Sequence, residues 1–136
     1  MSAKMKILIV DDDEKTAELV KILLTRVGCE VQLAPNGKLG LELAFAHKFD
    51  LIILDVDLPD ANGFEICREL KKQHLFSRVP VIFASGRSIE ENFEKGRQAG
   101  GVDYIMKPFG ANDFVRRVLA HVKTNPEDIH TAKASP

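Results

Sequence analysis

The sequence predicts a three-layer α/β domain in which helices cover both faces of a parallel sheet of five strands. Two patterns carry this prediction. Five short apolar runs alternate with longer segments of helical period along the 136 residues, which is typical of repeated strand and helix units. The central runs LIIL (51–54) and VIFA (81–84) lack the polar alternation of a strand with one wet face. Strands of this kind are buried on both sides, as they are in parallel sheets.

The same patterns place the individual elements. We expect strands at Lys6–Val10, Glu30–Leu33, Asp50–Leu54, Val79–Ala84 and Asp103–Met106. A first helix should follow the first strand, because an apolar stripe runs from Ala17 to Val27 and Gly28 is placed to end it. Similar spacing predicts four further helices around 39–44, 64–70, 89–96 and 114–122. Ser88 and Glu91 have the spacing of a capping box at the start of the fourth helix.

Composition limits the class of protein. The formal net charge is −1, so no field of one sign would steer the chain to nucleic acid, and we expect no direct nucleic-acid partner. We expect one domain over residues 1–123, followed over 124–136 by a frayed tail or linker with few apolar residues. The first apolar run is too short to span a bilayer and no signal peptide precedes it, so we expect a cytoplasmic protein without a membrane partner. We expect reduced thiols at Cys29 and Cys67. The histidines show no ligand spacing, and we expect all four on the surface: His47, His74, His121 and His130.

Reactive side chains follow four of the five predicted strands. They are Asp11 and Asp12 after the first, Asp55 after the third, Ser85 after the fourth and Lys107 after the fifth. The carboxyl ends of parallel strands share one edge of the sheet, where open α/β sheets bind their ligands. We therefore expect these side chains to converge. Asp13 and Glu14 are better explained as caps of the first helix.

A cluster of three carboxylates needs positive charge. Each pair repels by roughly 4 kcal/mol at about 4 Å and an effective dielectric of about 20. Lys107 supplies one charge, and a hard divalent cation such as Mg²⁺, which prefers oxygen ligands, would supply the rest. Carboxylates, Mg²⁺, an ammonium and a hydroxyl together indicate a phosphoryl-transfer site, with Asp55 as the free nucleophile. Pro108 permits a cis bond that would aim Lys107 inward.

These motifs resemble the receiver domain of bacterial two-component response regulators, and in size the chain looks closest to the single-domain kind typified by the chemotaxis regulator. The resemblance runs from about Lys6 to Val122. It rests on ILIVDDDE, DLIILDVDLPDANGFEICREL, PVIFASG and AGGVDYIMKPF, which stand in the family's order and spacing. It implies a flavodoxin-like, doubly wound fold with strand order 2-1-3-4-5. It also implies a phosphoacceptor in signal transduction that catalyses its own phosphorylation and dephosphorylation and is not a turnover enzyme.

The resemblance also implies roles for the acidic residues. Asp11 and Asp12 would be the acid pair for Mg²⁺, with Asp12 as a direct ligand. Asp55 would touch the metal and accept phosphate from a sensor histidine kinase or a phosphotransfer protein. Asp57 would give the metal its backbone carbonyl.

The remaining roles concern the response to phosphate. Ser85 would hydrogen-bond the phosphate, Lys107 would pair with it, and Tyr104 would be the aromatic switch that turns inward when the hydroxyl moves. The readout surface would then be the fourth helix, fifth strand and fifth helix, with Ile89 and Phe93 mainly in core packing. Output would pass to a downstream protein partner, to a homodimer through this face, or to a domain beyond the given sequence.

Two positions depart from the commonest family pattern. Asp57 brings a further negative charge where many relatives have a neutral residue, and Arg87 is placed to answer it. Our hypothesis is that this pair gates water and sets the lifetime of the aspartyl phosphate; a solvated ion pair without kinetic role is the alternative. Asn62 stands where relatives often have Asp, and Gly63 is expected to supply a turn with positive φ.

Three alternatives stay open at this point. A phosphohydrolase of the haloacid-dehalogenase type also has an apolar run followed by DxD, but the acid pair comes first here and no cap segment is present. A receiver-like interaction module could signal without phosphate. A flavodoxin-type cofactor binder would need glycine or hydroxyl residues after the first strand, where this chain is acidic.

Overall fold

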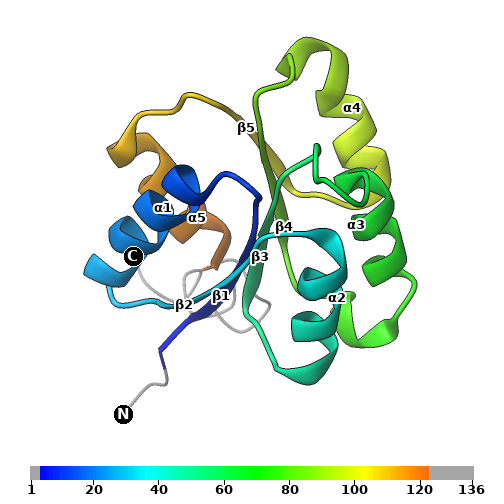
Figure 1. Ribbon diagram of the computed structural model, residues 1–136, viewed down its shortest axis with the longest axis horizontal. Helices are drawn as coiled ribbons and strands as arrows, with labels where there is room; N and C mark the ends of the chain where they lie inside the picture. The colour runs from blue at the N-terminus through cyan, green and yellow to red at the C-terminus, as the bar shows by residue number, and fades with distance from the viewer. Residues whose placement is uncertain (1–3, 123–136) are drawn as a thin grey trace, which may run out of the picture.

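The computed structural model describes residues 4–122 and confirms the predicted architecture (Figure 1). The strands are β1 (Lys6–Val10), β2 (Glu30–Ala34), β3 (Leu51–Leu54), β4 (Val81–Ser85) and β5 (Asp103–Met106). They pair in parallel, in the order β2-β1-β3-β4-β5. The helices are α1 (Glu14–Arg26), α2 (Gly37–Ala46), α3 (Gly63–Lys71), α4 (Ile89–Ala99) and α5 (Ala111–Val122), with a 3-10 turn η1 at His74–Phe76. The tail expected over 124–136 lies outside the described residues.

Helices cover both faces of the sheet, as Figure 1 shows. Helices α1 and α5 pack on one face, where Ile7 and Ile9 of β1 contribute to the core. Helices α2, α3 and α4 pack on the other face, over Leu8 and Val10 of the same strand. Every residue of β3 is buried, which explains why the LIIL run shows no polar alternation.

The ends of the helices follow local chemistry. Asp13 caps α1, because its carboxylate accepts from the backbone N–H groups of Lys15 and Thr16, as predicted. Gly28 lies just past α1 with φ +92°, a conformation that favours glycine. Val27 was expected on the buried stripe but is half exposed, since it is already the C-cap residue.

Several local predictions were wrong. β4 begins at Val81 rather than Val79, because Pro80 has no N–H to donate to a neighbouring strand. The capping box does not form: the Ser88 side chain makes no cap hydrogen bond, and its carbonyl accepts from the Asn92 side chain instead. Gly63 does not have positive φ. It is the first residue of α3, where a Cβ atom would lie 2.2 Å from the Asp55 carbonyl oxygen.

Cysteine and histidine environments are mostly as expected. Cys29 and Cys67 are free and buried, and burial raises the pKa of the Cys67 thiol to about 11. His47 and His74 are exposed. His121 is only partly exposed, because its Nε2 lies 3.2 Å from the Asp103 carboxylate. His130 lies outside the described residues, and within 4–122 no helix is both long and apolar enough to cross a membrane.

Candidate functional site

The sheet brings the predicted acidic residues to one edge. Asp11 directly follows β1, and its backbone N–H donates to Ala34 at the end of β2. Asp55 directly follows β3, and its N–H donates to Val10 at the end of β1. The strand ladder therefore holds both carboxylates in fixed positions. Asp12 stands next to them with an exposed side chain.

Lys107 joins this cluster from the far end of the chain. Its Nζ lies 2.7 Å from Asp11 Oδ2 and 3.1 Å from Asp55 Oδ2. The side chains of Asp11 and Asp55 are 4% and 9% exposed, so water screens these ion pairs weakly. The peptide bond between Lys107 and Pro108 is cis, as the sequence allowed. The predicted convergence of these residues is therefore present in the fold.

The carboxylate cluster fits a hard cation. Oxygens of Asp11, Asp12 and Asp55 all lie within 4.8 Å of one another. Lys107 compensates one of these three negative charges, and it contacts two of the carboxylates. An oxygen-only, anionic and partly open site of this kind suits Mg²⁺.

Charge and burial compete in setting the pKa values of the site. Burial raises the pKa of Asp55 above its usual range, although the Lys107 charge opposes this. Burial would lower the pKa of Lys107, but its hydrogen bond to Asp11 and the negative charge of Asp55 leave that pKa raised. Lys107 is therefore a permanent cation at neutral pH.

The loop after Asp55 closes one side of the site. The Asp57 backbone N–H donates to Asp55 Oδ1 at 3.1 Å, and Asp57 pairs with Asn62 through an isolated β-bridge. Asn62 then caps α3 by accepting from the Phe64 N–H. Close packing of Gly63 against the Asp55 carbonyl completes this turn.

Asp57 also forms the predicted pair with Arg87. Arg87 Nε lies 2.9 Å and 2.8 Å from the two carboxylate oxygens of Asp57, and a second guanidinium nitrogen lies 2.5 Å from one of them. The hydrogen bond from Arg87 lowers the pKa of Asp57. The pair bridges the loops that follow β3 and β4, with both side chains about half exposed.

Ser85 and Tyr104 both contact the backbone of Arg87. Ser85 is fully buried, and its Oγ accepts from the Arg87 N–H at 3.2 Å. Tyr104 is 1% exposed, and its hydroxyl donates to the Arg87 carbonyl at 3.1 Å. Among the described residues no hydrogen bond joins Ser85 to Asp55. Burial raises the pKa of Tyr104.

Sequence reasoning missed three contacts of the surrounding structure. Asp60 accepts from the N–H groups of Gly37 at 2.7 Å and Lys38 at 2.9 Å, which ties the loop after β3 to the start of α2. Asp103 of β5 is held by Arg117 of α5. The first contact joins residues 23 positions apart, so no local spacing signals it. Phe93 was assigned mainly to core packing, but it is 45% exposed on α4.

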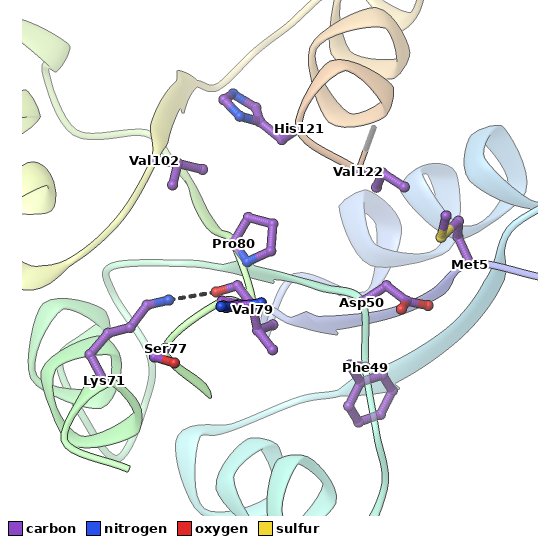
Figure 2. A pocket seen from close by; sticks show the side chains of 11 residues that line it. Met5, Phe49, Asp50, Lys71, Ser77, Val79, Pro80, Val102, His121 and Val122 are labelled. Carbon is purple, nitrogen blue, oxygen red and sulfur yellow. Dashed lines mark hydrogen bonds between the residues drawn. The ribbon is translucent and has the colours of Figure 1, made fainter. Parts of the chain in front are cut away.

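A hollow with a partly apolar lining lies away from this cluster. A pocket of about 350 Å³ is lined by Met5 before β1 and by Val122 of α5, near the amino ends of the strands (Figure 2). Lys71 reaches its rim, but its ammonium donates to the backbone carbonyls of Phe76 and Val79, which ties α3 to the connection before β4. None of the acidic residues predicted for the site lines this pocket.

Comparisons with known proteins identify the family of the chain. The family model described as response regulator receiver domain matches residues 7–119. The chain is 40% identical over 114 residues to the transcriptional regulatory protein CusR of Escherichia coli K12, covering 84% of this chain and 49% of that protein. It is 39% identical over 118 residues to the uncharacterized transcriptional regulatory protein YrkP of Bacillus subtilis, covering 87% of this chain and 49% of that protein.

Solved structures give the same picture. A CheY-like response regulator receiver domain protein from Methanospirillum hungatei aligns with a TM-score of 0.82 and 31% identity, covering 88% of this chain and 94% of that one. By contrast, this chain spans about half the length of the curated relatives that it matches.

Proposed function

The chain belongs to the response regulator receiver family, and we propose that Asp55 is the residue through which it accepts phosphate from a sensor histidine kinase or a phosphotransfer protein. The observation that carries this proposal is the meeting of Lys107 with Asp11 and Asp55, next to Asp12, at the carboxyl edge of the sheet. The position of Asp55 after β3 is fixed by the backbone on both sides.

The transfer step is a direct displacement at phosphorus. An Asp55 carboxylate oxygen forms the new O–P bond while the P–N bond of the donor phosphohistidine breaks, and the electron pair of that bond stays on the imidazole nitrogen. Lys107 stays beside Asp55 and compensates charge on the phosphoryl oxygens. Ser85, the last residue of β4, would donate its hydroxyl to one of those oxygens.

Mg²⁺ would be held by the carboxylates of Asp11, Asp12 and Asp55 and by the backbone carbonyl of Asp57. When bound, it supplies the positive charge that lets an anionic donor approach three carboxylates. Asp12 would add a solvent-exposed ligand to the two buried carboxylates. Water would remove the phosphate from Asp55 by attack at phosphorus. The chain would act only on its own phosphate and is therefore not a turnover enzyme.

Signalling would use the face formed by α4, β5 and α5. Phe93 of α4, Val102 just before β5 and Met106 of β5 are large apolar residues that are nearly half exposed. A downstream protein or a second copy of the chain would bury them. The named relatives are transcriptional regulators about twice as long as the matched region. We do not propose that the receiver domain of this chain itself binds nucleic acid. A cytoplasmic location fits this role.

Intact-mass measurement tests the proposal. The chain is incubated with acetyl phosphate and Mg²⁺, beside Asp55→Asn and the control Asp50→Asn, which alters an exposed acid just before β3. We expect one added phosphate on the parent and on the control, and none on Asp55→Asn. Phosphate on Asp55→Asn, or none on the parent, would refute the assignment.

A further inference from the structure

We infer that Asp60 is a positioning residue for the metal site: it caps α2 from the loop that follows Asp55, and so holds the Asp57 backbone carbonyl where Mg²⁺ would bind. The inference rests on the proposed function, because it concerns the affinity of that site for Mg²⁺. It gives a role to an exposed acid to which the sequence analysis assigned none.

Both carboxylate oxygens of Asp60 are used at the start of α2. Oδ1 accepts from the Gly37 N–H at 2.7 Å, and Oδ2 accepts from the Lys38 N–H at 2.9 Å. The next N–H of the helix, that of Leu39, donates to the Asn36 side chain at 2.8 Å. The first three N–H groups of α2 therefore all have acceptors, and two of these acceptors come from a residue more than 20 positions away.

The contact joins an anion to the positive end of a helix. The hydrogen bonds from the Gly37 and Lys38 N–H groups lower the pKa of Asp60, so its carboxylate is ionised at neutral pH. The helix dipole also favours a negative charge at this end of α2. The loop after β3 is therefore attached to α2 by an oriented, charge-assisted contact.

Close packing lets this loop reach the helix. Gly37 is buried, and a Cβ atom there would lie 3.1 Å from Asp60 Oδ1 and 3.1 Å from Ala61 Cβ. The same atom would lie 2.7 Å from Ile66 Cδ1 on α3. A side chain at position 37 would thus push the loop away. Its absence leaves the carboxylate within hydrogen-bond distance of the helix backbone.

A short turn connects this anchor to Asp57. Asp57 and Asn62 pair as a β-bridge, and between them the Leu58 N–H donates to the Ala61 carbonyl at 3.2 Å. Asp60 lies inside this turn, three residues after Asp57. Because the turn is closed by these contacts, a shift of Asp60 moves the backbone of Asp57, whose carbonyl is a proposed metal ligand.

The expected loss of affinity is moderate. Residues that orient metal ligands typically contribute about 10- to 100-fold to metal affinity. Asp60 acts on Asp57 through the turn, and Arg87 still holds the Asp57 side chain when Asp60 is replaced. We therefore expect removal of the Asp60 carboxylate to weaken Mg²⁺ binding by about three- to tenfold.

Titration with Mg²⁺, followed by two-dimensional amide NMR, measures this affinity without any phosphodonor. The variants are Asp60→Ala and Asp60→Asn. The matched control is Glu65→Ala, which removes another exposed acid close to the same loop, in the first turn of α3. The dispersion of the amide resonances verifies that each variant is folded.

We expect Asp60→Ala to bind Mg²⁺ about three- to tenfold more weakly than the parent, and Glu65→Ala to bind it as the parent does. Asp60→Asn should lie between Asp60→Ala and the parent, because its amide oxygen can accept from one of the two N–H groups.

Equal affinity in Asp60→Ala and the parent would overturn the inference alone. Equal losses in Asp60→Ala and Glu65→Ala would also contradict it, as would an Asp60→Asn protein as weak as Asp60→Ala, because either result would mean that negative charge alone matters. A parent that binds no Mg²⁺ would overturn the metal site of the proposed function, and the inference with it.

Hydrogen exchange tests the same link from the helix. Coupling between two sites is reciprocal, so Mg²⁺ should slow exchange of the Gly37 and Lys38 amides by about three- to tenfold in the parent and leave it unchanged in Asp60→Ala. The Leu39 amide, which donates to Asn36, is the internal control and should change less. A purely structural cap would protect the first two amides equally with and without Mg²⁺, and that result would sink the inference.

Discussion

Replacing Gly63 by alanine tests how tightly the turn after Asp55 is packed. A Cβ atom there would lie 2.2 Å from the Asp55 carbonyl oxygen and 2.9 Å from the Val56 Cα, all backbone atoms that cannot rotate away. The turn must move by about 1 Å to reach even a tight van der Waals contact. Overpacking of this kind costs about 1–3 kcal/mol, whereas alanine in place of glycine in a helix gains at most about 1 kcal/mol. The clash should prevail.

We therefore expect Gly63→Ala to lower the free energy of unfolding by about 1–2 kcal/mol in urea titrations. Since a displacement of about 1 Å at a reacting group can cost about a hundredfold in rate, phosphorylation by acetyl phosphate should fall more steeply than stability. Gly110→Ala is the matched control, because a Cβ there meets nothing within 4 Å. A Gly63→Ala protein as stable and as readily phosphorylated as this control would refute the packing argument.

Three further predictions follow from the charges. Lys107→Met removes the cation from two buried carboxylates. In urea titrations it should lower the free energy of unfolding by about 3 kcal/mol without Mg²⁺ and by less with Mg²⁺. Equal losses in both buffers would contradict the metal site. The double change Asp57→Asn with Arg87→Ala should alter the rate of phosphate loss followed by intact mass, and an unchanged rate would rule out the water gate. Burial raises the pKa of Asp103, but the hydrogen bonds from Arg117, the Tyr104 N–H and His121, together with the Arg117 charge, outweigh burial and leave that pKa below 3.8, so these contacts stabilise the fold above that pH and are lost on acidification. Arg117→Met should thus lower the free energy of unfolding, measured by urea titration, by roughly 1–3 kcal/mol at pH 7 and by less at pH 3. A loss that grows on acidification would contradict this prediction.

The acidic edge of the site was predictable because it follows from chain topology. Once alternating runs indicate a parallel sheet, the residues after its strands must share an edge, however far apart they are in sequence. Asp11, Asp55 and Lys107 meet for this reason. The departure of Asp57 from the common family pattern led to the predicted pairing with Arg87, and the structure contains this pair.

Other features depend on contacts that leave no periodic signal. Gly63 looked like a turn former, yet its small size matters because the Asp55 carbonyl lies against it. Phe93 is exposed on α4, and the spacing of apolar residues alone did not separate the buried face of this helix from its exposed face. Tyr104 is buried and its hydroxyl donates to the Arg87 carbonyl, a backbone contact that no residue pattern signals.

The most direct test of the account asks which carboxylate carries the phosphate. An acyl phosphate, unlike a free carboxylate, is reduced by borohydride, so a phosphorylated aspartate becomes homoserine that peptide mapping can locate. After incubation with acetyl phosphate and Mg²⁺, we predict homoserine at position 55 and aspartate unchanged at Asp11, Asp12 and Asp57. Homoserine at any of these three, or phosphate incorporated without homoserine at position 55, would contradict the account.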